Sequence, residues 1–252
     1  MRHKLILLLL ACLVFLTCKK HPNYMTKIEA VNIDITDSLG STASIDEFVK
    51  PYRDHINKDL DSVLAYSVDT YSKSDGELNT AIGNFMADLV YVQANPVFKS
   101  RTGKEIDFVL LNHGGIRSII SKGNVTTRTA FKVMPFENSI VVLDLQGQKV
   151  KELIEYLVRN KRAHPISKLN IELDTDLNLK TASLNERPLD FNKNYLVCTN
   201  DYLANGGDRM NFFKEPDSLY ILDYKIRNAL IDYLKNTDTI RPVRDNRFIQ
   251  TN

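Results

Sequence analysis

The feature that most constrains the fold is a short apolar run at residues 106–111, which ends abruptly at Asn112 and a pair of glycines. A run of this length, bounded by turn residues, is typical of a buried strand. Gly114 and Gly115 permit a positive φ and let a ligand approach the backbone closely. Arg117 follows them, and a guanidinium group is a common partner of anions. The pattern fits an anion-binding loop and, equally, a plain strand-to-loop turn with a surface arginine.

A second turn precedes another strong strand pattern, at residues 140–145. Pro135 stiffens this turn, and Phe136 and Asn138 lie at the mouth of the strand. An aromatic side chain beside a cation and an amide can stack on a flat ring while the polar groups bind its edges. Taken singly, however, an aromatic residue such as Phe136 is more often part of a core.

Hydrophobic periodicity predicts the other elements. It indicates helices at residues 45–68, 78–94, 147–160 and 224–234, a helical turn at 127–133, and strands at 27–35, 168–173, 179–184 and 194–199. In the first helix, Phe48, Tyr52 and Ile56 fall on one predicted buried face. Because helices and strands mix without strict βαβ alternation, we expect an α+β fold with mixed β-sheet layers and packed helices.

The N-terminus has the pattern of a secretion signal. A basic start is followed by an apolar run at residues 5–17 that is too short to span a bilayer. The run ends at Cys18, and the ending resembles a bacterial lipobox. A simple secretory signal with a chance cysteine and an uncleaved anchor are the alternatives. We predict a lipoprotein signal peptide over residues 1–18 with lipid on Cys18, a tether over 19–26 and one domain over 27–252. The protein is then expected in the cell envelope, lipid-anchored to a bacterial membrane and facing the periplasm or the surface.

Composition and side-chain spacing argue against several functions. The net charge is only +2 and the basic residues are scattered, so nucleic acid is not an expected partner. Cys198 lies within a strand pattern and is expected to be an inert core thiol. The histidines are isolated along the sequence, and no metal-ligand spacing or nucleophile elbow occurs. We therefore expect no catalytic residue, metal or cofactor site in this chain.

Three stretches together resemble, in order and spacing, the signatures of a known domain: Asn112-His113-Gly114-Gly115-Ile116-Arg117, Met134-Pro135-Phe136-Glu137-Asn138 and Asn205-Gly206-Gly207-Asp208. The domain is the C-terminal, substrate-binding domain of bacterial 5′-nucleotidases and UDP-sugar hydrolases. Gly83, Asn84 and Asp88 likewise resemble a part of that family's first helix. The resemblance runs from about residue 27 to the C-terminus.

The resemblance implies a nucleotide or nucleoside as ligand. Domains of this family clamp the base between two aromatic rings, and these positions correspond to Phe136 and Tyr202. Asn138 corresponds to a residue that hydrogen-bonds the base, Asp208 to one that binds the ribose hydroxyls, and Arg117 to one of three phosphate-binding arginines. The implied substrate-binding set is Asn112, Gly114, Gly115, Arg117, Phe136, Asn138, Tyr202, Gly206, Gly207 and Asp208.

Two departures from the family pattern concern phosphate binding. The other family arginines precede the position of Glu77, where Lys73 is the only basic residue of this stretch. A family glycine after the helix at 147–160 is replaced near Arg162. Arg162 or Lys161 either supplies the missing charge or blocks the pocket.

The resemblance also implies that catalysis lies elsewhere. In the family, the metal ligands belong to a separate metallophosphoesterase domain, for which this chain has no matching motifs. We therefore expect the nucleotide- or nucleoside-binding part of an extracytoplasmic 5′-nucleotidase-type phosphohydrolase. A separately encoded metallophosphoesterase partner would hold the divalent metals. The alternatives are a non-catalytic envelope lipoprotein that binds nucleosides or nucleotides, and a structural lipoprotein with a decayed pocket.

Overall fold

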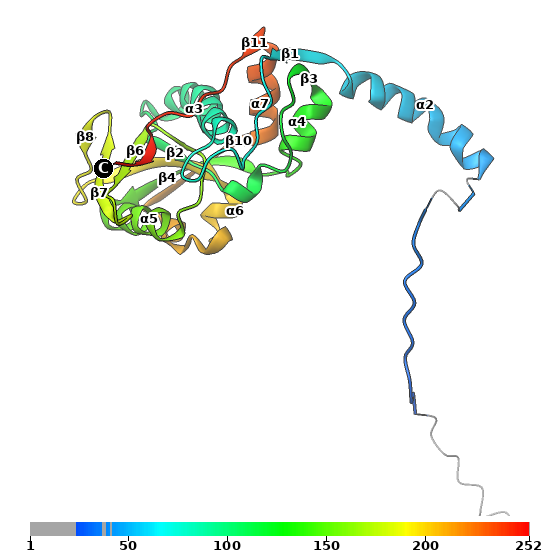
Figure 1. Ribbon diagram of the computed structural model, residues 1–252, viewed down its shortest axis with the longest axis horizontal. Helices are drawn as coiled ribbons and strands as arrows, with labels where there is room; N and C mark the ends of the chain where they lie inside the picture. Colours follow the sequence, from blue (N-terminus) through cyan, green and yellow to red (C-terminus); the bar gives the residue numbers. More distant parts are fainter. Residues whose placement is uncertain (1–23, 37–38, 41, 252) are drawn as a thin grey trace, which may run out of the picture. The chain divides into compact units, whose positions relative to one another are not determined.

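The computed structural model describes residues 24–36, 39–40 and 42–251 (Figure 1). The predicted signal peptide, Cys18 and residues 19–23 of the predicted tether lie outside this range. The chain divides into two compact units between Val49 and Lys50. Within the described residues, no helix combines the length and the apolar character needed to cross a membrane.

Three predictions for the N-terminal part are wrong. Residues 27–35 form neither strand nor helix, because a strand requires a hydrogen-bonded neighbour and none of the described strands pairs with this segment. Helix α2, Ala43–Leu60, stops well before residue 68, and β1, Val63–Ser67, follows as a separate strand. The predicted buried face of α2 is also wrong, since Phe48 is 71% exposed and Ile56 54% exposed.

A five-stranded mixed sheet forms the centre of the second unit, in the order β10-β4-β9-β2-β5. Its strands are β2, Phe108–Leu110; β4, Ser139–Gln146; β5, Ile166–Ser167; β9, Asn194–Asn200; and β10, Ser218–Lys225. The β2–β9 pair is parallel, and the other neighbouring pairs are antiparallel. The predicted α+β fold with mixed sheets is confirmed.

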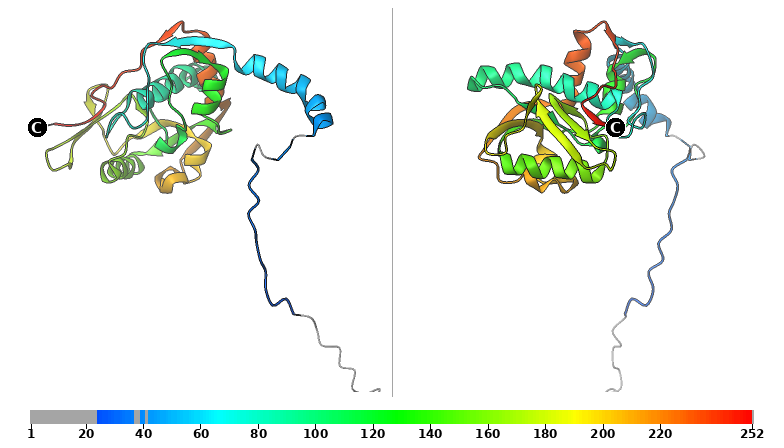
Figure 2. Two further views of the ribbon diagram at one scale, coloured as in Figure 1. Left: turned by 45° about the vertical axis from the view of Figure 1, so that its right-hand side comes forward. Right: turned by 60° about the vertical axis from the view of Figure 1, so that its left-hand side comes forward.

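Helices cover both faces of this sheet (Figure 2). One face packs against α3, Ala81–Thr102, and α7, Ile226–Lys235, and the other against α5, Gly147–Asn160. Side chains alternate along each strand as the pleat requires: Val109 points to the first core and Phe108 to the second. Cys198 is fully buried in the first core, which confirms the predicted core thiol, and burial raises its pKa.

Two smaller sheets and several short helices complete the fold. One sheet has the order β11-β1-β3 and the other β12-β6-β7-β8. The remaining elements are β3, Gly123–Thr126; α4, Thr127–Val133; β6, Leu169–Leu173; β7, Leu179–Leu184; β8, Arg187–Pro188; α6, Asp201–Ala204; β11, Thr239–Ile240; and β12, Phe248–Gln250. Single-turn 3₁₀ helices lie at η1, His113–Gly115; η2, Gly207–Arg209; and η3, Asn211–Phe213.

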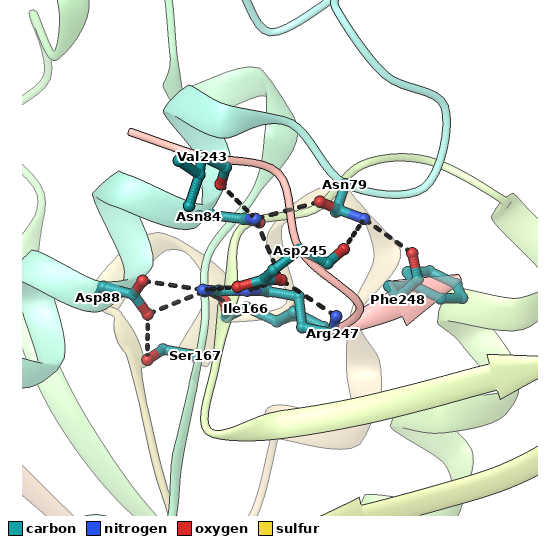
Figure 3. Close-up of polar contacts among 9 residues, drawn as sticks. All are labelled: Asn79, Asn84, Asp88, Ile166, Ser167, Val243, Asp245, Arg247 and Phe248. Atoms are coloured by element: carbon teal, nitrogen blue, oxygen red, sulfur yellow. Dashed lines mark hydrogen bonds and ion pairs between the residues drawn. The ribbon is translucent and has the colours of Figure 1, made fainter. Parts of the chain in front are cut away.

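A polar network fastens the C-terminal segment to α3 and β5 (Figure 3). Arg247 forms a bidentate pair with Asp88 at 2.8 and 2.9 Å, a second pair with Asp245, and a hydrogen bond to the Ile166 carbonyl at 2.7 Å. Asn84 Nδ2 donates to the Val243 carbonyl at 3.1 Å. The family-like Asn84 and Asp88 on α3 are therefore structural residues that hold the last strand in place.

Candidate functional site

The site lies at one edge of the central sheet, where strand ends converge. β2 and β9 run parallel, so both end at the same edge, and the antiparallel β4 begins there. Asn112 follows β2, the turn with Phe136 and Asn138 precedes β4, and Tyr202 follows β9. The carboxyl ends of parallel strands are a common place for ligands because loops there converge.

A cavity of about 370 Å³ opens at this edge. It is lined by seven of the ten sequence-predicted site residues, namely Asn112, Gly114, Arg117, Phe136, Asn138, Tyr202 and Asp208. The predicted residues are thus brought together from three separate segments of the chain. Gly206 and Gly207 lie beside the cavity in a neighbouring open concavity. Gly115 is buried behind it, where an added Cβ would lie 3.1 Å from the Asn112 side-chain oxygen.

Tyr202 and Asp208 hold one another in place. The Tyr202 hydroxyl donates to Asp208 Oδ1 at 3.0 Å and accepts from the Asp208 backbone N–H at 3.2 Å. Gly207 lies against the ring, since an added Cβ would come within 2.4 Å of it. The glycine therefore allows the Tyr202 ring to lie flat against the loop. Asp208 itself has a φ of 52°, a left-handed conformation that is uncommon outside glycine.

The turn that carries Phe136 is held by Arg227 of α7. The Arg227 guanidinium pairs with Glu137 and donates to the carbonyls of Pro135 at 3.1 Å and Phe136 at 3.4 Å. Its side chain is only 8% exposed, and it lies over the Phe131 ring at 4.2 Å. Arg227 is thus a positioning residue for the turn. Sequence reasoning missed it, because an arginine on an amphipathic helix gives no sign of the loop that it reaches.

Asparagine side chains tie the strand ends together at the floor of the site. Asn200 caps α6 by accepting from Leu203 N at 2.8 Å, and its Nδ2 donates to Asn112 Oδ1 at 3.2 Å. Asn138 Nδ2 donates to Asp201 Oδ1 at 3.0 Å. The side-chain Oδ1 of Asn138 has no donor among the described residues and remains available as an acceptor. Asp201 is therefore the partner that orients Asn138.

Arg117 is the cation among the described residues that line the cavity, and its charge also acts on Lys73. Burial, followed by the charges of Arg117 and Arg162, lowers the pKa of Lys73. Arg117 also lies over the Phe136 ring, with 5.9 Å between its Cζ and the ring centroid. Arg162 follows a distant helix in sequence, yet it lines an adjoining cavity that shares Asp208 with this one. A cluster of like charges of this kind is stabilised by an anion.

Two histidines form the wall behind the glycine loop. The backbone N–H of His113 donates to His164 Nδ1 at 3.3 Å, and the ring Nδ1 of His113 lies 3.1 Å from the Ala163 carbonyl oxygen. Burial lowers the pKa of His113, and it lowers the pKa of His164 to about 4, so His164 is neutral at pH 7. His113 and His164 are thus neighbours in the fold, although they are isolated along the sequence. Within the described ranges, no group of three or more metal-ligating side chains occurs.

Comparison with known proteins identifies a family. Residues 61–215 match the model of the family described as 5′-nucleotidase, C-terminal domain. The chain is 29% identical over 182 residues to a trifunctional nucleotide phosphoesterase protein of Bacillus subtilis, a match that covers 62% of this chain and 12% of that protein. It is 27% identical over 229 residues to a cell wall protein of Listeria monocytogenes, covering 84% of this chain and 28% of that protein.

A solved structure shows the same fold. The crystal structure of a 5′-nucleotidase precursor from Thermus thermophilus matches with a TM-score of 0.69 and 23% identity, covering 82% of this chain and 43% of that chain. The chain therefore spans less than half the length of each of these three relatives. Because the family model matches more than half of the 252 residues, the chain belongs to the family of 5′-nucleotidase C-terminal domains.

Proposed function

We propose that this chain is the nucleotide- or nucleoside-binding part of an extracytoplasmic 5′-nucleotidase-type phosphohydrolase. A separately encoded metallophosphoesterase supplies the divalent metals and the attacking water, and lipid on Cys18 anchors the chain in the envelope. The observation that carries the proposal is the cavity in which two aromatic rings, an arginine and an aspartate meet.

The aromatic rings suit a nucleobase. Phe136 is 42% exposed and Tyr202 45% exposed, although large aromatic side chains are usually buried. Arg227 holds the turn of Phe136, and Asp208 holds the hydroxyl of Tyr202. Rings that are accessible yet fixed lose little entropy when a base stacks on them. Each such stack contributes about 1–3 kcal/mol.

The polar groups suit the rest of a nucleotide. Asp208 Oδ1 is occupied by Tyr202, whereas Oδ2 has no donor among the described residues and can accept a ribose hydroxyl. Lys73, Arg117 and Arg162 together provide charge for a phosphate, in place of the arginines that the family usually carries. Arg162 thus supplies charge to the phosphate site.

Binding is tested by isothermal titration of the purified protein with adenosine and AMP, in the presence of EDTA. Phe136→Ala should weaken adenosine binding roughly tenfold or more, because one stack is lost, and should leave the thermal midpoint nearly unchanged. Tyr66→Ala is the matched control, since Tyr66 is 43% exposed and lies on β1, outside the cavity. The proposal fails if the parent binds neither ligand, or if Phe136→Ala mainly destabilises the fold.

Hydrolysis is tested separately. We expect the chain alone to show no metal-dependent hydrolysis of AMP, and a candidate metallophosphoesterase with a divalent cation to hydrolyse AMP faster when the chain is added. Robust turnover by the chain alone would contradict the division of roles. Nucleotide binding without any effect on a partner would instead favour a non-catalytic envelope-binding lipoprotein.

A further inference from the structure

A second cavity, of about 240 Å³, adjoins the first. It is lined by Tyr156, Asn160, Arg162, His164, Asp208 and Arg209. Asp208 lines both cavities, so the two share one wall. No sequence motif pointed to this cavity, because its lining comes from the end of α5, the loop after it and the η2 turn.

The charge of the second cavity is positive. Arg162 and Arg209 contribute two cations and Asp208 one anion. Neither guanidinium group makes a hydrogen bond or ion pair with the part of the chain that the structure describes. Two unpaired guanidinium groups facing one cavity are suited to an anion with several oxygens, because each can donate two parallel hydrogen bonds to it.

The backbone is strained where it presents these side chains. Asp208 and Arg209 have consecutive positive φ values of 52° and 62°, and Lys161, just before Arg162, has a φ of 47°. Non-glycine residues in this region cost free energy and concentrate at ligand sites. The Tyr156 hydroxyl supports the loop by donating to the Asp208 carbonyl at 2.9 Å.

The rear wall of the second cavity is formed by neutral side chains, and the described lining residues there add no negative charge. His164 is buried and neutral, and its ring lies 5.8 Å from that of Tyr156. Asn160 contributes an amide at the exposed rim. Among the described lining residues, Asp208 is therefore the one carboxylate, and its Oδ1 is already engaged by Tyr202.

The shared wall relates this cavity to a bound nucleotide. If Asp208 accepts a hydroxyl of a ribose in the first cavity, the hydroxyl edge of that sugar faces the second cavity. We propose that the cavity between Arg162 and Arg209 binds a phosphate group esterified to a ribose hydroxyl of the nucleotide whose base lies between Phe136 and Tyr202. This inference rests on the proposed function and extends it to a substrate class, nucleotides phosphorylated at the 3′ or 2′ position.

Titration calorimetry with four probes tests the inference: adenosine, 5′-AMP, 3′-AMP and 2′-AMP, with EDTA and at one low ionic strength. We expect 3′-AMP or 2′-AMP to bind roughly tenfold more tightly than adenosine, because new charge-assisted hydrogen bonds form. Arg209→Gln should reduce the ratio of the 3′-AMP or 2′-AMP affinity to the adenosine affinity several-fold. Arg162→Gln should reduce it too and should also weaken 5′-AMP. The difference in affinity between the phosphorylated probes and adenosine should shrink as salt is added, because salt screens the charges.

Arg187→Gln is the matched control, because Arg187 is an exposed arginine on β8, outside both cavities. It should leave all four affinities unchanged. The inference is overturned if a 3′- or 2′-phosphate adds nothing to adenosine binding, or if Arg209→Gln lowers the ratio no more than Arg187→Gln does. In those cases adenosine still binds and the proposed function stands. If adenosine and all three phosphates fail to bind, the proposed function fails as well.

Discussion

Arg247→Met should destabilise the fold strongly, because it removes the centre of the network that holds the C-terminal segment. The Arg247 guanidinium makes five hydrogen bonds and is 13% exposed. Removing one partner of a buried ion pair costs about 3–5 kcal/mol. Here the cost should be lower, because the Asp88 and Asp245 side chains stay 47% and 40% exposed. Asp88 also keeps its bond from Ser167. We expect a loss of about 2–4 kcal/mol in the free energy of unfolding.

Urea unfolding followed by circular dichroism measures this loss. The matched control is Arg244→Met, three residues earlier, whose exposed side chain makes one hydrogen bond to the Asp75 carbonyl at 3.0 Å. Its loss should be no more than about 1 kcal/mol. If the two variants lose the same stability, or if Arg247→Met loses less than its control, the network does not hold the segment and the reasoning is wrong.

The pH dependence gives an independent check. Burial raises the pKa of Asp245, but the hydrogen bonds from Arg247 outweigh it and hold the pKa below the ordinary value of 3.8. A carboxyl whose pKa is lower in the folded state stabilises the fold above its unfolded pKa, and this stability is lost as the pH falls through the folded value. The difference in stability between the parent and Arg247→Met should therefore narrow below about pH 3.8. An unchanged difference at pH 3 would contradict this cause.

Three further substitutions test other parts of the chain. Gly207→Ala places a Cβ 2.4 Å from the Tyr202 ring, so calorimetry should show adenosine binding weakened roughly tenfold with a nearly constant melting temperature; unchanged binding would mean that the ring need not lie against the loop. Gly147→Ala places a Cβ 2.3 Å from the Phe191 carbonyl oxygen, and urea unfolding should show a loss of about 1–3 kcal/mol from overpacking; a neutral result would show that the Phe191 backbone moves freely. Cys18→Ala should release the protein from membranes in cell fractionation, because the acylated cysteine is the predicted anchor; retention at the precursor mass would indicate an uncleaved anchor.

Sequence patterns predicted best where periodicity is strong or residues form local motifs. The helix at residues 147–160 and the turn at 127–133 match α5 and α4 in both bounds. The signature stretches also predicted most of the lining of the first cavity. The first stretch follows β2, the second directly precedes β4, and the third follows the short helix α6 that comes after β9. Placing these strands therefore placed the motifs close to their final positions. Each strand and each turn is determined by residues that are neighbours in sequence. The pairing of the strands then brings these turns to one edge of the sheet.

Features that depend on distant partners could not be predicted. The pattern at residues 27–35 alternates like a strand, but alternation does not supply a neighbour. The helix was predicted through residue 68 because Leu64 continues the helical spacing of apolar residues. An apolar residue at this position fits a strand equally well, and Leu64 lies in β1. Arg227 and Tyr156 reach the site from helices whose sequence shows only ordinary amphipathicity, and Arg209 reaches it from the η2 turn beside the third signature stretch. Their roles depend on contacts with distant loops and on a left-handed backbone conformation in η2. Neither can be recognised in a single sequence.

The parallel pairing of β2 with β9 has a consequence for how the protein acquires its cavity during folding. Thr199 Oγ1 donates to the Leu110 carbonyl across 89 residues of sequence, so this pair closes a long loop and is expected to form late. Asn112 and Tyr202 become neighbours only when that closure is complete. Partly folded chains should therefore have the helices of the fold but lack the cavity. Because a ligand that binds only the closed state stabilises it by mass action, ligand binding would select chains that have finished this last step.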